Sequence, residues 1–273
     1  MGLSRDRVSI ALDKIKLDGP APLAIRRHNI LKHKWSVLPE YVLGAYDMCP
    51  KKMLDLGFEM ELLADNDVGY DQRRDRITFA IRDYLGQLVG VSGRSHEDWN
   101  QPRYRVYDED FYGVDPNYVA STKEHLYGLQ TVYPARYFDP DADHPPLIIV
   151  EGYKGCLWLR QLGFTHAVAL QGTIMTQHQE RFLARMRGPF YVLLDWEEGK
   201  SWPDVKRRCA ALSIARRLSR TDRTLICHYG DKPEGTSPDD LNQEDVEEAL
   251  ESAMTASEHV AQTIKQQPRR VRK

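Results

Sequence analysis

One short segment constrains the fold of this chain more than any other, residues 146–155 with the sequence PLIIVEGYKG. A run of apolar residues directly before a glycine turn is typical of a strand that is buried on both faces of a parallel sheet. The strand delivers one carboxylate, Glu151, into the turn, where Gly152 and Gly155 allow the backbone to bend sharply. We therefore expect the C-terminal half of the chain to fold around Glu151.

The same pattern occurs twice more downstream. Residues 190–194 form a second predicted strand that ends at Asp195 and Glu197, and residues 224–227 form a third, whose following loop carries Asp239. The intervening segments 156–163, 176–187 and 205–218 are predicted helices. Alternating strands and helices predict a parallel sheet with right-handed crossovers, and such sheets bind ligands beyond the carboxyl ends of their strands. The acids at these ends should therefore meet at one edge of the sheet.

These acids predict a metal site. Clustered carboxylates repel one another unless protons or cations neutralise them. Magnesium prefers oxygen ligands and is typically held by one or two carboxylates together with substrate phosphates. The sequence thus predicts Mg²⁺, or Mn²⁺ in its place, at a site that catalyses phosphoryl transfer and is built from Glu151, Asp195, Glu197 and Asp239. The alternative for Glu151 is that it is only a helix N-terminal acid. Of the two neighbouring aspartates Asp239 and Asp240, we expect Asp239 to be the ligand, because Asp240 can cap the turn. Lys154 and Lys200 are expected to lie on the surface, with contact to a phosphate as the alternative for Lys200.

At these residues the chain resembles the Toprim domain, whose signature is a strand-terminal glutamate and a later strand-terminal pair of acids. Within that superfamily it looks most like the bacterial DnaG-type DNA primases, because the motifs EGYKG, AVALQGT, DWE and EGTSPDDL follow in the family's order. The upstream segments RDRITFAIRDYLGQLVGVSGR and HLYGL also resemble the part of primases that precedes Toprim. The resemblance covers residues 35–250 and implies a Rossmann-like parallel sheet for the C-terminal domain.

The chain departs from the family pattern at three acidic positions. Gly155 stands where the family usually has an aspartate, Glu197 replaces the second aspartate of the dyad, and Ser237 replaces the first aspartate of the last motif. The predicted site keeps enough acids for one metal ion, and the number of ions is left open.

Upstream of this domain, residues 76–91 predict a β-hairpin with its turn at 83–86, in a segment rich in arginine. The resemblance implies that basic residues here bind template phosphates or the incoming triphosphate; these are Arg76, Arg82, Arg94, Arg103 and Lys123. Arginine suits this role because its planar group donates two parallel hydrogen bonds to a phosphate. The alternative is an ordinary solvated strand face with surface ion pairs, which contribute little.

The predicted elements give an α/β fold with a mixed organisation along the chain. We expect a helical N-terminal region at 1–70, a small basic mixed α/β subdomain at 71–145, the Toprim domain at 146–256 and a basic tail at 257–273. The net charge of −2 conceals the local concentration of arginines.

The composition excludes several classes of protein. No apolar run is long enough to span a membrane, and the N-terminus lacks the apolar centre of a secretion signal. The 4 cysteines lie far apart without a CxxC motif, so no zinc is expected. Primases of this type usually carry a zinc-binding domain ahead of the core, which another chain would have to supply here.

The resemblance implies a DNA-directed RNA polymerase of the primase type, which makes short RNA primers for DNA replication. Its partners would be a single-stranded DNA template, ribonucleoside triphosphates, and a replicative helicase or a separate zinc-binding protein of the primosome. Its location would be the cytoplasm of a bacterium or of a phage-infected host. Two alternatives are a Toprim nuclease, and a non-catalytic DNA-binding replication protein with a degenerate metal site, which Gly155 and Ser237 favour.

Overall fold

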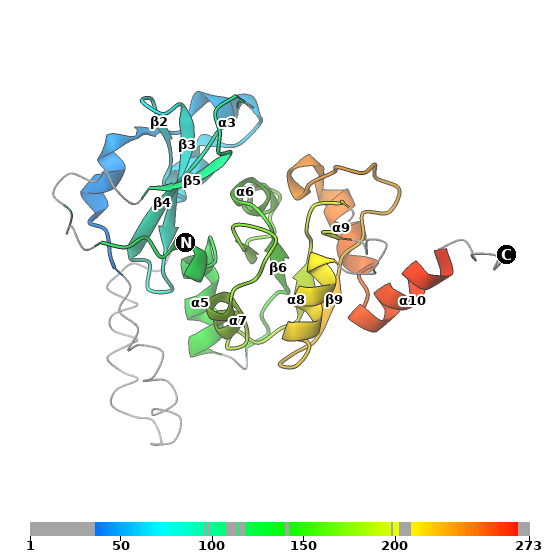
Figure 1. The fold of residues 1–273 in the computed structure, drawn as a ribbon. Coiled ribbons are helices and arrows are strands. Elements are labelled where there is room, and N and C mark those ends of the chain that lie inside the picture. Colours follow the sequence, from blue (N-terminus) through cyan, green and yellow to red (C-terminus); the bar gives the residue numbers. More distant parts are fainter. Residues whose placement is uncertain are drawn as a thin grey trace, which may run out of the picture.

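Two β-sheets form the framework of the protein in a computed structural model (Figure 1). The structure describes residues 36–266, except residues 96, 98, 108–113, 115–117, 140–141, 198 and 202–208. The first sheet is antiparallel, has five strands in the order β1-β2-β3-β4-β5, and lies within residues 47–107. The second sheet is parallel, has four strands in the order β7-β6-β8-β9, and lies within residues 147–226.

The antiparallel sheet is built around a central hairpin, β3 (Arg76–Arg82) and β4 (Leu88–Arg94), as the sequence predicts. The outer strands are β1 (Asp47–Met48), β2 (Val68–Asp71) and β5 (Tyr104–Tyr107). Nearly all of β3 is buried on both faces. The 3₁₀ helix η1 (Glu40–Ala45) covers one face, and the second domain covers the other.

The segment before residue 71 is less helical than the sequence predicts. It contains α3 (Lys51–Asp55) and α4 (Met60–Asp65), but it also supplies β1 and β2. The strand β2 pairs with β3 along its whole length, as the first strand of a hairpin that begins before the region where the sequence predicts strands. The first 35 residues of the predicted helical region lie outside the described residues.

The parallel sheet has the alternating order that the sequence predicts. Its strands are β6 (Leu147–Val150), β7 (Ala167–Ala169), β8 (Phe190–Val192) and β9 (Thr224–Ile226). The connecting helices are α6 (Tyr153–Gln161), α7 (Gln177–Leu183) and α8 (Ala210–Leu218). Alternate residues of β6 pack in opposite directions: Ile148 and Val150 face the core with α6, whereas Leu147 and Ile149 face the core with α5 (Leu129–Phe138), α7 and α8. Both faces are covered, which explains the uninterrupted apolar run.

The strand order places a topological switch point between β6 and β8. The chain leaves β6 through α6 to reach β7 on one side, and then returns to the other side of β6 to form β8 and β9. Open α/β sheets bind ligands at such a point, beyond the carboxyl ends of the strands. Glu151 follows β6, and Asp195 lies three residues after the end of β8.

The two sheets share one hydrophobic core. The ring of Phe79 on β3 stacks on the ring of Tyr153 on α6, with 4.5 Å between the ring centroids. The same core contains Ile77 of β3 and Leu157 of α6. This packing places β4 and β5 beside the first turn of α6, close to Glu151.

The C-terminal helices continue the second domain. After β9 come the short η3 (Pro238–Asp240), α9 (Gln243–Glu251) and α10 (Ala256–Gln266). The last of these packs on α8 and β9, so ordered structure continues past residue 256, where the sequence predicts a basic tail (Figure 1). Residues 267–273 of that tail lie outside the described residues. None of the helices within the described ranges is both long and apolar enough to cross a membrane.

Candidate active site

Three acids gather around one lysine at the switch point of the parallel sheet. The Lys200 ammonium nitrogen lies 2.9 Å from Asp195 Oδ2, 3.3 Å from Glu151 Oε2 and 3.3 Å from Glu197 Oε1. The side chains of Glu151 and Asp195 are about one-fifth exposed, at 22% and 23%. The structure thus brings three of the four predicted metal ligands to a single cation.

Glu151 is the most enclosed of these acids. Its Oε2 atom is buried and accepts no hydrogen bond from the described residues, so the ammonium group of Lys200 is an ion-pair partner without hydrogen-bond geometry. Burial raises the pKa of Glu151, and the negative charge of Asp195 raises it further, while Lys200 lowers it. A buried carboxylate oxygen in this state is a ready ligand for a metal ion.

Lys200 is a site residue that the sequence analysis places on the surface. Burial lowers its pKa, but the hydrogen bond and charge of Asp195 outweigh burial, so the pKa of Lys200 is raised overall. The side chain is 24% exposed. Its position close behind the DWE motif is the one signal in the sequence that could have found it, because a lysine near two acids often pairs with them.

Backbone hydrogen bonds fix the segment that carries Asp195 and Glu197. The Trp196 N–H donates to the carbonyl of Thr236 at 2.8 Å, and the Gly235 N–H donates to the carbonyl of Trp196 at 2.9 Å. The indole ring of Trp196 also stacks on Tyr229. These contacts tie the loop after β8 to the loop that leads into η3 and therefore to Asp239.

Asp239 faces a different cation from the other three acids. Its Oδ2 atom lies 2.6 Å from the ammonium nitrogen of Lys154, which belongs to the first turn of α6. Lys154 is therefore not the free surface lysine that the sequence predicts. The neighbouring Asp240 accepts hydrogen bonds from the backbone and hydroxyl of Ser237, which is the capping role considered for it.

Two departures from the family pattern have a structural reason here. A Cβ atom on Gly155 would lie 3.2 Å from the Cβ of Pro238, because α6 packs directly on η3. A side chain at this position would need Pro238 to shift by a few tenths of an ångström. Ser237 is the N-cap of η3 and forms a capping box with Asp240, so its hydroxyl is occupied by the turn.

The predicted phosphate-binding residues fall into two groups. Arg76 is 3% exposed, and its guanidinium group donates to carbonyl oxygens of Asn100, Pro102 and Arg103 and to the Asn100 side chain. Arg82 pairs with Glu40 at 2.8 Å and with Asp67 at 2.6 Å. The guanidinium groups of Arg76 and Arg82 are already bound within the protein, so these two arginines act first on the stability of the structure.

The other predicted basic residues lie closer to the acids or to solvent. Arg94 Nε donates to the hydroxyl of Tyr104 at 3.1 Å, and a Cβ atom on Gly152 would lie 3.7 Å from that hydroxyl. Arg94 therefore borders the turn that carries Glu151. Arg103 is exposed on the loop before β5.

Lys123 belongs to the short helix η2 (Thr122–Glu124) and reaches the loop after β7. Its ammonium group donates to the carbonyl of Gln171, and the next residue, Gly172, donates its N–H to the carbonyl of Glu151 at 3.1 Å. Burial lowers the pKa of Lys123, and the charge of Glu151 raises it. Lys123 thus lies near Glu151, on a short helix that packs against β4 of the first sheet.

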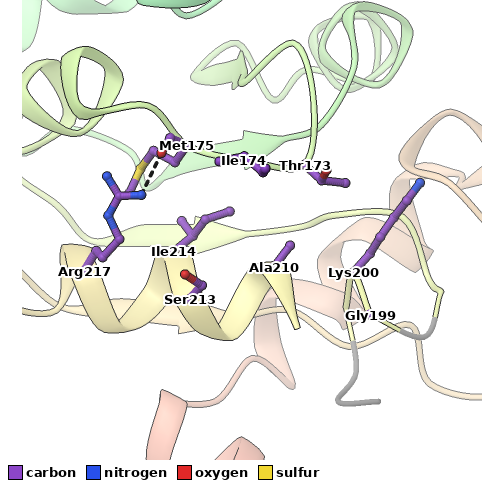
Figure 2. A pocket seen from close by; sticks show the side chains of 9 residues that line it. All are labelled: Thr173, Ile174, Met175, Gly199, Lys200, Ala210, Ser213, Ile214 and Arg217. Carbon is purple, nitrogen blue, oxygen red and sulfur yellow. Dashed lines mark hydrogen bonds between the residues drawn. The ribbon is translucent and has the colours of Figure 1, made fainter. Parts of the chain in front are cut away.

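A hollow of about 390 Å³ opens beside the acids, between the loop after β7 and α8 (Figure 2). Thr173, Ile174 and Met175 line one side, while Ala210, Ser213 and Ile214 of α8 line the other. Arg217 closes one end and donates to the carbonyl of Met175 at 2.6 Å. Lys200 lines the opposite end, so the residue that pairs with the acids also borders the hollow (Figure 2).

The donor set fits a hard divalent cation. The converging oxygens are all carboxylate oxygens, which Mg²⁺ and Mn²⁺ prefer, and Glu151 Oε2 lacks a hydrogen bond among the described residues. Within the same residues, no group of three or more acid, histidine or cysteine side chains is arranged so that it could hold a metal ion. Lys200 occupies the space between the acids instead.

Comparison with known proteins agrees with this geometry. No family model matches the chain. A DNA primase of Pseudomonas aeruginosa is 30% identical over 232 residues, which make up 83% of this chain and 30% of the relative. A DNA primase of Deinococcus radiodurans is 34% identical over 150 residues, 55% of this chain and 24% of the relative. The chain thus spans less than a third of the length of these relatives.

The fold is also similar to that of a solved primase structure. A solved structure of a DnaG primase catalytic domain bound to single-stranded DNA superposes with a TM-score of 0.59 at 22% identity. The match covers 82% of this chain and 80% of that one. The fold therefore agrees over both sheets, and the sequence similarity extends over most of the chain. Together these similarities support a DnaG-type primase core for this chain.

Proposed function

We propose that this chain synthesises short RNA primers on single-stranded DNA by metal-dependent nucleotidyl transfer. The observation that carries the proposal is the meeting of Glu151, Asp195 and Glu197 around one cation at the switch point. In this reaction the 3′-hydroxyl oxygen bonds to the α-phosphorus of the incoming nucleotide, and pyrophosphate leaves. Negative charge is concentrated on the phosphates throughout, so positioning and charge neutralisation supply most of the catalysis.

The acids would hold Mg²⁺ or Mn²⁺, and the bound ion would neutralise the triphosphate. Glu151, Asp195 and Glu197 are the first candidates for ligands, because they already share one cation. Asp239 would join them once its carboxylate turns away from Lys154.

Phosphate binding would fall to the basic residues that border the acids. Arg94 and Lys123 both lie near the turn of Glu151, and Arg103 is exposed on the loop before β5. Arg76 and Arg82 would support this surface by holding the strands and loops that form it. A replicative helicase, a separate zinc-binding protein and a cytoplasmic location complete the proposal, and they rest on the family resemblance alone.

A primer-synthesis assay tests this function. Labelled ribonucleotides, single-stranded DNA and Mg²⁺ or Mn²⁺ should yield short RNA products with the wild-type chain. Glu151→Gln should lower the yield by at least about 100-fold, since a neutral amide removes one charge from the cation site. The matched control is Glu234→Gln, an exposed acid on the loop after β9, which should leave the yield unchanged.

A second candidate is a non-catalytic DNA-binding replication protein. It is favoured by the neutralisation of the acids by Lys200 and Lys154 and by the absence of an acid at Gly155, which packs closely on Pro238. DNA binding without any RNA product under all metal conditions would support it. Shortened DNA in the same assay would instead indicate a Toprim nuclease.

A further inference from the structure

We propose that Lys200 occupies the metal site of this chain and competes with the metal ion for it. Its ammonium group holds the three carboxylates together before metal arrives, and a divalent cation must displace it to bind. This inference rests on the proposed function, because it assumes that the acids bind a metal ion. It concerns a residue that is absent from the acid motifs of the family.

The ammonium group of Lys200 and a metal ion would occupy the same space between the acids. Lys200 Nζ lies within 3.3 Å of an oxygen from each of Glu151, Asp195 and Glu197. A divalent cation shared by the same carboxylates would need the same space, since its ligand oxygens lie about 2.0–2.6 Å away. The ammonium group and the metal ion therefore exclude each other.

Lys200 is held in place by its own turn. Its N–H donates to the carbonyl of Glu197 at 3.1 Å, and Ser201, which is 1% exposed, donates its N–H to the same carbonyl at 3.1 Å. The Ser201 hydroxyl in turn accepts the N–H of Glu197 at 3.0 Å. Gly199 has a φ of 83°, which favours glycine and directs the chain back toward the acids. The turn thus presents the lysine to the carboxylates.

The structure also leaves room for the lysine to move. Lys200 lines one end of the hollow of about 390 Å³ beside α8 (Figure 2). Thr173 and Ser213 offer hydroxyl groups along its walls. The flexible side chain can withdraw into this space when a metal ion takes its place, without any change in the sheet.

The test measures metal affinity directly. Mn²⁺ binding to the whole chain is followed by electron paramagnetic resonance of the free ion, for wild type and Lys200→Gln. Removal of the competing charge should tighten Mn²⁺ binding by about tenfold or more. The matched control is Lys232→Gln, which breaks an ion pair with Asp245 at 2.7 Å away from the acids and should leave the affinity unchanged. Unchanged or weaker Mn²⁺ binding by Lys200→Gln would overturn the inference.

A second measurement uses the wild-type chain and so does not depend on the folding of a variant. Amine-selective acetylation is quantified by mass spectrometry for Lys200 and Lys232, with EDTA and with saturating Mg²⁺. Release of Lys200 from the acids should increase its labelling several-fold in Mg²⁺, while labelling of Lys232 stays constant. Equal labelling of Lys200 in both conditions would contradict displacement.

The outcomes separate this inference from the proposed function. A wild-type chain that binds no Mn²⁺ and makes no primers overturns both. A wild-type chain that binds Mn²⁺ and makes primers, with the same affinity in Lys200→Gln, overturns the role of Lys200 alone.

Discussion

Arginines of one sheet differ in what their guanidinium groups already contact. Arg76 and Arg82 are bound to carbonyl and carboxylate groups of the protein. Arg94 donates from Nε to the hydroxyl of Tyr104 and lies over the ring of the same residue. Its other guanidinium N–H groups donate to none of the described residues. A phosphate can therefore be bound by Arg94 without breaking an ion pair, whereas Arg82 would first have to leave two carboxylates.

This difference predicts opposite effects of two similar variants. Arg94→Ala should weaken single-stranded DNA binding. It should also make the negative slope of log affinity against log salt concentration shallower by about 0.7, because one phosphate contact is lost. Arg82→Ala should leave that slope unchanged but destabilise the protein by about 1–2 kcal/mol, since Glu40 and Asp67 lose their partner. Fluorescence anisotropy across a salt series and urea unfolding measure the two effects. An equal change of the salt slope in both variants would contradict the assignment of Arg94 to phosphate binding and of Arg82 to stability.

At the residue scale, the sequence predicts the meeting of the acidic site residues better than the contacts of the basic ones. Glu151 and Asp195 follow buried strands, so their meeting follows from the rule that parallel strands end at one edge. The roles of Arg76 and Lys200 depend on which carbonyls or carboxylates come within reach, and those partners come from loops whose paths no periodicity encodes.

At the scale of elements, the contact between β4 and η2 positions Lys123. A Cβ atom on Gly90 of β4 would lie only 2.4 Å from the Cγ2 atom of Thr122, the first residue of η2. Thr122 is 2% exposed and β-branched, so it has little freedom to move aside. The glycine thus allows η2 to approach the sheet and brings Lys123 to the loop beside Glu151.

Gly90→Ala should therefore destabilise the protein by about 1–3 kcal/mol through overpacking. It should also raise the KM for ribonucleotides, because η2 is displaced and Lys123 moves with it. Gly44→Ala is the matched control, since its Cβ atom would meet no atom within 4 Å. Urea unfolding and primer-synthesis kinetics measure both effects, and a Gly90→Ala chain as stable as Gly44→Ala would contradict the packing argument.

Elements with strong local patterns are predicted well from the sequence. The hairpin of β3 and β4 and the unit of β6 and α6 both appear where the sequence places them. The strands β1 and β2 are missed because they are short, and the partner of β1 lies about 20 residues further along the chain. Short strands of this kind form through pairing rather than through intrinsic preference.

At the scale of the whole molecule, the active site lies where two sheets share one core. The sequence analysis separates a basic subdomain from the Toprim domain, and the structure joins them through Phe79, Tyr153 and Tyr127. This aromatic cluster sets the distance between Arg94 on one sheet and Glu151 on the other. No single-segment pattern predicts such a contact, because its members come from β3, the loop before α5, and α6.

Shared packing predicts that the two sheets unfold together. Phe79 is fully buried between them, so Phe79→Ala should cost about 3–5 kcal/mol. Hydrogen exchange should then show an equal loss of protection for amides of β3 and of β6, because a single core supports both strands. Val119→Ala, at a side chain that is 70% exposed, serves as the control and should change neither. A loss confined to β3 and β4 would show that the sheets are separate folding units, and the aromatic cluster would then orient the site without stabilising the parallel sheet.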